Sequence, residues 1–241
     1  MKVLLFCPTA RLEQETVDSI MRLDPAGHEL DIVFTRHNPT HRKSVNILLN
    51  YQRGRAMTLA GGYDAMLCIE SDMVIPPDAL GKLATADADI ACGLYVHRHY
   101  TTATRPFWNP QVWREETTEP EDWLNWYPDK RDAAWGNVVR VSAGGLGCAL
   151  IHRRVLELID FRLVFFPNHA LISDCDTWLY HDAIKTGYRI VCDLSVICGH
   201  KEPDGAILWP DRHRQMWAQP STYRTSSPYT LGVASHGTAN H

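Results

Sequence analysis

Residues 66–80, MLCIESDMVIPPDAL, join an apolar run to two closely spaced acids. Its first four residues are apolar and predict a buried strand, and Glu70 and Asp72 follow at once. Carboxylates grouped beside an apolar strand are unfavourable unless something compensates their charge. The pattern therefore indicates either a cation site at the end of the strand or an acidic pair that caps the next helix or faces water.

Apolar segments of strand length alternate with segments of helical period on both sides of this stretch. Strands are predicted at 2–7, 29–35, 65–70 and 88–96, and helices at 13–23, at 44–60 and from Pro77 through Leu83. This alternation is typical of parallel strands joined by crossover helices. We therefore expect an α/β fold with a Rossmann-like, mostly parallel sheet and helices on both faces.

The regular pattern breaks after residue 96. The segment 97–137 is rich in aromatic residues and has no steady period, so we expect an irregular insertion there. Its tryptophans are Trp108, Trp113, Trp123, Trp126 and Trp135. These rings either line an acceptor site or fill a satellite core.

Regular elements return after the insertion. Strands are predicted at 138–144 and 147–152, a short helix at 153–159, a helix at 176–187 closed by Gly187, and one or two strands from 188 to 200. Residues 219–241 are small and polar, which predicts a loose or surface-bound tail.

Composition excludes several classes of protein. The 241 residues, 45% hydrophobic and 22% charged, suit one large globular domain or two small ones. A net charge of -4 argues against non-specific electrostatic binding to nucleic acid. There is no run of about 18 apolar residues, so we expect no membrane span, and the apolar start of the chain is read as a strand and not as a secretion signal. Seven scattered cysteines without a CxxC pair indicate reduced thiols in a cytoplasmic protein.

Ligands of open parallel sheets bind beyond the carboxyl ends of the strands. Glu70 and Asp72 are placed there, and in an extended chain residues two apart point to the same side. Such a pair could hold Mg²⁺ or Mn²⁺, which prefer oxygen ligands, and the cation could bridge the phosphates of a nucleotide diphosphate.

Four stretches resemble, in order, the GT-A glycosyltransferases that use nucleotide sugars. They are FCPTARLEQETVDSIMRL (6–23), NYQRGRAMTLAGGYDAMLCIESDMVIPPDAL (50–80), GGLGCALIHRRVLELI (144–159) and SDCDTWLYHDAIKTGYRIVCDLSVICGH (173–200). Glu70 stands for the first Asp of the family's D-x-D motif, and Cys175 stands for the Glu of its E-D pair. The resemblance covers most of residues 1–200 and is nearest to the inverting, family-2-like type. It implies a GT-A domain over residues 1–218, with 97–137 on the acceptor side.

The resemblance implies roles for the charged residues. Asp72 is the expected metal ligand, Glu70 assists through water or the ribose, and His200 is a third protein ligand unless it is a histidine hydrogen-bonded in a loop. Asp176, or Asp174 beside it, is the expected general base; the alternative role for either is to cap the helix that follows.

The nucleotide would meet residues from several of these stretches. The expected contacts are Pro8, Thr9 and Arg11 after the first strand, one of Arg53 and Arg55 on the second helix, the Glu70–Ser71–Asp72 motif, and Gly144 and Gly145. Glycines there either bring backbone close to a ligand or allow a tight turn.

The implied activity is hexosyltransferase-like. A sugar would move from a nucleotide-diphosphate sugar, with UDP as the expected nucleotide, to a hydroxyl of a glycan, a protein, a small molecule or a modified nucleic acid, with Mn²⁺ or Mg²⁺ as cofactor. A sugar-phosphate nucleotidyltransferase is one alternative, although CPTARLEQE lacks the glycines of its first loop. A non-catalytic nucleotide- or glycan-binding module of the same fold is the other. GGLG is not the dinucleotide fingerprint, which disfavours a NAD enzyme.

Overall fold

A computed structural model describes residues 1–9, 11–97, 109–114, 125–126, 137–168, 170–203 and 205–210. The tail 219–241 and most of the insertion 97–137 lie outside these ranges, so the predictions made for them stay predictions. Among the tryptophans of the insertion, Trp113 packs against the core, which agrees with a core role for that ring.

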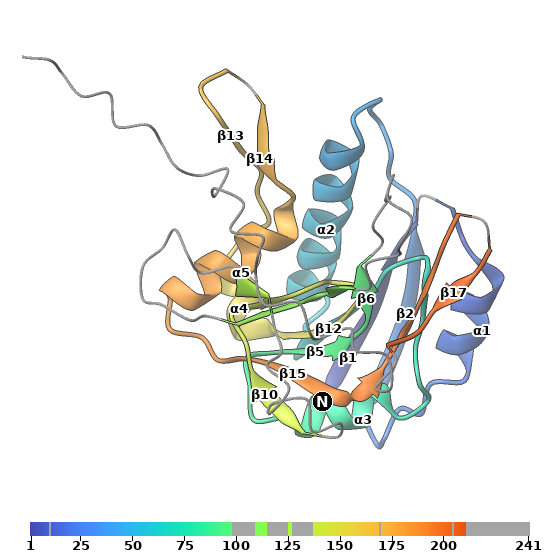
Figure 1. The fold of residues 1–241 in the computed structure, drawn as a ribbon. Helices are drawn as coiled ribbons and strands as arrows, with labels where there is room; N and C mark the ends of the chain where they lie inside the picture. The colour runs from blue at the N-terminus through green and yellow to red at the C-terminus, as the bar shows by residue number, and fades with distance from the viewer. Residues whose placement is uncertain are drawn as a thin grey trace, which may run out of the picture.

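The centre of the protein is a seven-stranded sheet with the order β10-β15-β5-β12-β3-β1-β2 (Figure 1). The strands are β1 (Lys2–Pro8), β2 (Glu29–Thr35), β3 (Ala65–Ile69), β5 (Ile90–Leu94), β10 (Val138–Arg140), β12 (Cys148–His152) and β15 (Ile190–Ile197). β1, β2, β3, β5 and β15 run in one direction, whereas β12 and β10 run in the other. The predicted α/β fold with a mostly parallel sheet is therefore confirmed.

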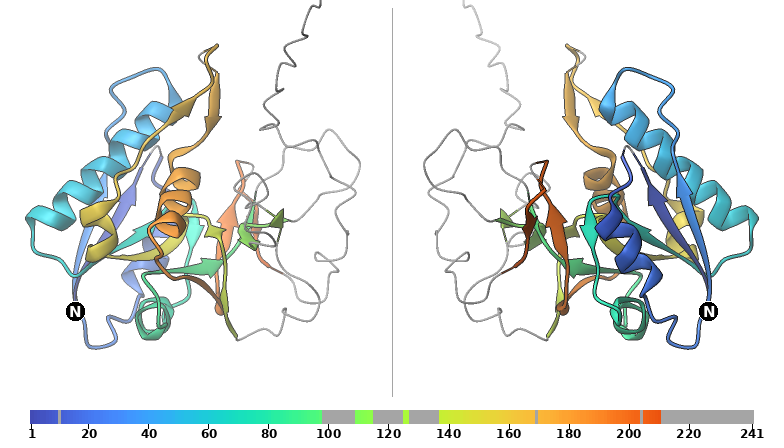
Figure 2. Two further views of the ribbon diagram at one scale, coloured as in Figure 1. Left: turned by 90° about the vertical axis from the view of Figure 1, so that its left-hand side faces the viewer. Right: turned by 90° about the vertical axis from the view of Figure 1, so that its right-hand side faces the viewer.

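Helices cover both faces of the sheet (Figures 1 and 2). α1 (Gln14–Met21) and α3 (Ala79–Thr85) pack on one face, and α2 (Lys43–Ala60), α4 (Arg153–Leu158) and α5 (Cys175–Lys185) pack on the other. Strand residues alternate between the two: in β1, Leu4 and Phe6 face α2, α4 and α5, whereas Leu5 faces α1 and α3.

The ends of the helices follow local sequence. α5 ends in a Schellman motif: Gly187 has φ +86°, the Tyr188 amide donates to the Ala183 carbonyl, and the Gly187 amide donates to that of Ile184. This confirms Gly187 as the predicted cap. The prediction for Pro77 is wrong by two residues, because α3 begins at Ala79 and Pro77 lies before it.

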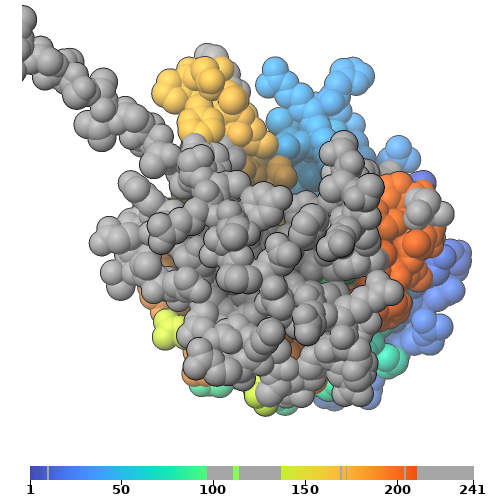
Figure 3. All heavy atoms as spheres, in the orientation of Figure 1, coloured from blue at the N-terminus to red at the C-terminus, as the bar shows by residue number. Residues whose placement is uncertain are grey.

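Short strands surround the main sheet. They are β4 (Met73–Val74), β6 (Val96–His97), β7 (Asn109–Pro110), β8 (Val112–Arg114), β9 (Asn125–Trp126), β11 (Ala143–Gly144), β13 (Val164–Phe165), β14 (Leu171–Ser173), β16 (Gly199–Lys201) and β17 (Ile207–Leu208). The strand predicted at 138–144 is thus two strands, β10 and β11. The β13–β14 hairpin and the start of α2 project from the same end of the molecule (Figures 1 and 3). Within the described ranges, no helix has both the length and the apolar character that a bilayer crossing requires.

Candidate functional site at the carboxyl end of β3

The chain turns directly after β3, and its first acid points back into the protein. The Glu70 amide donates to the Gly147 carbonyl (3.1 Å), and the Glu70 carboxylate accepts from the Tyr51 hydroxyl (2.8 Å). Tyr51 is buried on α2, and its ring stacks on Phe161 with 5.1 Å between centroids. Burial, together with the charge of Glu70, raises the pKa of Tyr51, so the phenol stays a proton donor to the carboxylate.

Asp72 lies beside His200 because β4 pairs with β16. His200 is the cross-strand partner of Met73, and the Lys201 amide donates to the Asp72 carbonyl (2.8 Å). The His200 Nε2 atom lies 3.7 Å from Asp72 Oδ1. On the other side of the ring, Nδ1 lies 2.8 Å from the Val96 carbonyl, which only accepts, so Nδ1 carries a proton and Nε2 is the acceptor nitrogen whenever the ring is neutral.

Asp72 and His200 could supply two ligands to one divalent cation. Adjacent ligands in the octahedral shell of Mg²⁺, each about 2.1 Å from the ion, are about 3 Å apart. The 3.7 Å between His200 Nε2 and Asp72 Oδ1 is longer than this, so a shared cation would draw the two side chains closer together. Across the described ranges, no three His, Cys, Asp or Glu residues lie close enough together to hold a metal ion. The predicted three-ligand set is therefore not assembled: Glu70 is directed to Tyr51, and a cation here would take its other ligands from water and phosphate.

The two candidate bases differ sharply in environment. Asp174 occupies the N-cap position of α5 but is exposed, and its side chain makes no capping hydrogen bond. Asp176 is half-buried in the first turn and accepts from the Thr177 amide at 2.7 Å. Burial raises the pKa of Asp176 to about 6, and the charge of Asp174 adds to the rise. A carboxylate with a pKa near neutral is well suited to general base catalysis, which favours Asp176.

Tyr95 connects the two acidic parts of the site. Its buried ring meets that of His200 edge-on, with 5.4 Å between centroids, and its hydroxyl accepts from the Gly147 amide (3.2 Å). Burial raises the pKa of Tyr95, and the charges of Glu70 and of Asp176 both add to this, so both carboxylates lie within electrostatic reach of one hydroxyl. We did not predict Tyr95 or Tyr51 as part of the site. Tyr95 lies near the carboxyl end of the strand predicted at 88–96, a position that could have identified it, whereas nothing around Tyr51 in the sequence points to Glu70.

The glycines after β10 make room for protein atoms and not for a ligand. A Cβ atom on Gly145 would lie 1.6 Å from the Tyr95 hydroxyl oxygen, and one on Gly144 would lie 2.4 Å from Cys92 Sγ. Both glycines are buried, and neither has a positive φ. Internal packing thus requires glycine at both positions, and contact of Gly144 and Gly145 with a nucleotide stays a prediction.

Residues after β1 lie at the carboxyl ends of the parallel strands, as the acids do. Pro8 ends β1, and the amide and hydroxyl of the buried Thr9 both donate to the Thr35 carbonyl. Arg11 is exposed and forms an ion pair with Glu13. The Ser71 carbonyl accepts from Thr16 on α1 at 3.0 Å, which ties the acidic loop to that helix.

The two arginines of α2 point in different directions. Arg53 is exposed. The Arg55 Nε atom donates to the carbonyls of Leu156 (2.7 Å) and Ile159 (3.1 Å) at the end of α4. Arg55 therefore holds α4 in place, which favours Arg53 for the nucleotide; the role of either arginine there stays a prediction.

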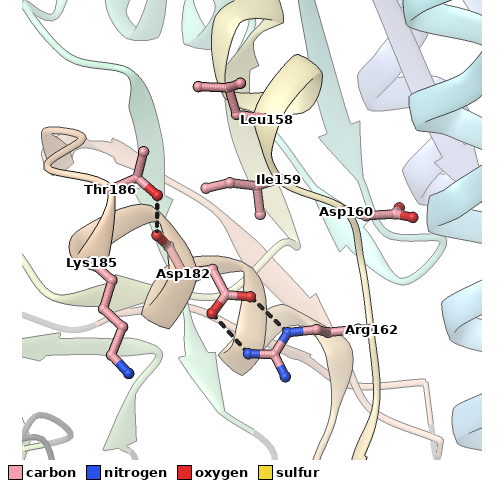
Figure 4. Close-up of a pocket in the computed structure, with 7 residues that line it drawn as sticks. All are labelled: Leu158, Ile159, Asp160, Arg162, Asp182, Lys185 and Thr186. Atoms are coloured by element: carbon pink, nitrogen blue, oxygen red, sulfur yellow. Dashed lines mark hydrogen bonds and ion pairs between the residues drawn. The ribbon is translucent and has the colours of Figure 1, made fainter.

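An open hollow of about 300 Å³ lies between α4 and the C-terminal end of α5 (Figure 4). Arg162 lines this hollow, and its Nε and Nη2 atoms donate to the two carboxylate oxygens of Asp182 at 2.7 and 2.8 Å. The guanidinium lies over the ring of Trp178. Because this ion pair satisfies the main charges of the hollow, we do not include it in the candidate site.

No family model and no curated protein matches this sequence. Three solved structures resemble the fold. A197 from STIV is 19% identical with a TM-score of 0.52, covering 88% of this chain and 96% of that one. GalNAc-T7, crystallised with UDP, GalNAc and Mn²⁺, is 8% identical (TM-score 0.49; 83% of this chain, 44% of that one). A glycosyltransferase involved in glycosylation of the major capsid of PBCV-1 is 9% identical (TM-score 0.34; 66% and 63%). Of these three, A197 alone has a TM-score above 0.5, and its similarity shows a shared fold over most of both chains.

Proposed function

We propose that the protein is a metal-dependent glycosyltransferase of GT-A type that transfers a sugar from a nucleotide-diphosphate sugar with inversion. One observation carries the proposal: Asp72 and the acceptor nitrogen of His200 lie 3.7 Å apart at the carboxyl end of β3. The pKa of Asp176 is raised to about 6, and the charges of Asp176 and Glu70 both raise the pKa of Tyr95, whose ring lies against His200. UDP is the proposed donor nucleotide, and buried, unpaired cysteines support a reducing, cytoplasmic setting.

Each residue has a defined task in this mechanism. Asp72 and His200 would hold Mn²⁺ or Mg²⁺, which stabilises the charge of a leaving diphosphate. The Val96 carbonyl keeps the His200 ring in the tautomer that presents Nε2. Glu70, oriented by the Tyr51 hydroxyl, accepts a hydrogen bond from the ribose.

Asp176 performs the proton transfer. Its carboxylate takes the proton of the acceptor hydroxyl as the oxygen of that hydroxyl forms its bond to the anomeric carbon and the bond to the diphosphate breaks. A raised pKa makes Asp176 a stronger base than an ordinary aspartate, while it remains mostly ionised at neutral pH. Asp174, exposed and next to it, serves to raise that pKa and is not the base in this proposal.

Incubation with a panel of nucleotide sugars, with Mn²⁺ or with a chelator, tests the proposal. We expect slow release of nucleoside diphosphate from one donor, only with metal, and lost in Asp72→Ala. Asp87→Ala is a matched control, since Asp87 is exposed and precedes β5 at the opposite edge of the sheet. Pyrophosphate formation from a nucleoside triphosphate and a sugar phosphate would instead show a nucleotidyltransferase, and donor binding without turnover would show a binding module.

A further inference from the structure

The two outer strands of the central sheet are protected to very different degrees. β10 has three residues and carries Arg140, whereas β2 has seven, ELDIVFT, and pairs with β1 without a break in register. Natural edge strands are normally kept from pairing with other chains by charged side chains, above all lysine, by proline, by a bulge, by short length or by a covering segment. β2 has no lysine, proline or bulge, and its two charged residues, Glu29 and Asp31, both lie within its first three positions.

Hydrogen bonds at the two ends of β2 show which backbone groups face outward. The Glu29 amide donates to the Met1 carbonyl (3.0 Å), and the Thr35 carbonyl accepts from the Thr9 amide (2.7 Å). Since backbone direction alternates along a strand, the odd-numbered residues of β2 bond toward β1. Leu30, Ile32 and Phe34 therefore direct their N–H and C=O groups to the open edge.

The same three residues form an apolar stripe on the face of the sheet that α1 and α3 cover at its middle. Leu30 packs at the margin of that core, while Ile32 and Phe34 are 37% and 36% exposed. Among the described residues, no strand pairs with the outer edge of β2. The strand thus presents backbone groups and apolar side chains side by side, which is the combination that a further strand would cover.

Charge identifies the strand that fits. Glu29 and Asp31 lie at the start of β2, and the exposed Arg36 and His37 follow its end. An identical strand placed antiparallel brings each acidic end beside the other's basic end, whereas a parallel copy would align like charges. We infer that β2 pairs antiparallel with β2 of a second copy of this chain, joining the two sheets across a two-fold axis.

Backbone geometry also restricts the register. Outward-facing residues must oppose outward-facing residues, so even-numbered positions pair with even-numbered positions. Placing Ile32 opposite Ile32 pairs all seven residues and sets Leu30 of each copy against Phe34 of the other. The result is an apolar stripe that continues through both copies.

Light scattering across a range of protein concentrations tests this inference and does not depend on sugar transfer. We expect a mass of twice 27.4 kDa for the natural chain, and half of that for Ile32→Lys with its thermal melting otherwise native. Val138→Lys, on the exposed edge strand β10, should leave the dimer intact. A natural chain that stays monomeric, or an Ile32→Lys variant that stays dimeric, would overturn the inference.

Cross-linking tests the register. Cα atoms of hydrogen-bonded antiparallel pairs are about 5.5 Å apart, which a disulfide can span. Ile32→Cys should therefore form a disulfide-linked dimer on mild oxidation, without interference from the seven native cysteines, all of which are buried. Val138→Cys is the control and should stay monomeric on denaturing gels; equal cross-linking of both variants, or of neither, would contradict the pairing.

Discussion

Replacing Asp176 with Asn should stabilise the protein at neutral pH while slowing catalysis. The pKa of this carboxyl is raised from 3.8 to about 6, chiefly by burial. The folded protein therefore holds the proton more tightly than the unfolded chain does, and ionising Asp176 opposes folding. The penalty is nearly absent at about pH 3, where both states are protonated, grows as pH rises from there to about 6, and is constant above that.

The expected size follows from the shift. About 2 pKa units correspond to about 3 kcal/mol, an upper bound because Asp176 is only half-buried. Asn keeps the shape and the bond to the Thr177 amide but carries no charge. Asp176→Asn should thus raise the free energy of unfolding by about 1 to 3 kcal/mol at pH 8 and by nearly nothing at pH 3.

Urea unfolding of the natural chain and the variant at both pH values gives this difference. Asp174→Asn is the matched control: its side chain is exposed, so we expect less than about 0.5 kcal/mol at either pH. In the transfer assay, Asp176→Asn should keep donor binding, and its rate of transfer should fall about 100-fold or more. The kcat/KM of the natural enzyme should fall as the pH drops through about 6, because Asp176 becomes protonated. Equal unfolding free energies at pH 8 would refute the buried-charge reasoning.

Three further substitutions test the packing that supports the site. Gly145→Ala places a methyl group against the Tyr95 hydroxyl and should destabilise the protein by about 3 kcal/mol in urea unfolding, and a neutral effect would mean that the segment shifts freely. Gly187→Ala forces a side chain to φ +86° at the end of α5 and should lower the free energy of unfolding by about 1 kcal/mol; no change in a thermal melt would contradict the cap. Tyr51→Phe removes the donor to Glu70 and should weaken nucleoside diphosphate binding by calorimetry while the far-ultraviolet circular dichroism stays native; unchanged affinity would remove Glu70 from the site.

Local sequence pattern was sufficient to predict the strands of the central sheet and to place the acids at the carboxyl ends of the parallel strands. Residues 65–69 form β3 because a continuous apolar run suits a strand buried on both faces, and Glu70 and Asp72 follow it as expected. The approach of His200 to Asp72 depends on pairing between β16 and β4, strands of three and two residues. Such short pairings carry almost no periodic signal, and the position of His200 was expected only from the resemblance to a family.

Side-chain contacts between distant segments were beyond the sequence. Arginine on such a helix is a typical nucleotide contact, but Arg55 bonds carbonyls of α4. Glycine in such a segment is typical of a ligand-binding turn, but Gly145 packs against Tyr95. Similarly, β12 lies antiparallel between β3 and β5, an order that strand and helix patterns do not encode. Each outcome depends on how elements pack in three dimensions, which no local period determines.

The most direct test of the central claim is titration calorimetry of UDP into the protein with Mn²⁺ present and absent, for the natural chain, Asp72→Ala and the control Asp87→Ala. A cation between Asp72 and His200 that bridges to a diphosphate predicts that the natural chain and Asp87→Ala bind UDP only with Mn²⁺, and that Asp72→Ala loses this metal-dependent binding although its melting temperature is unchanged. Equal affinity of Asp72→Ala and the natural chain for UDP in Mn²⁺ would contradict the proposed site and the sugar transfer built on it.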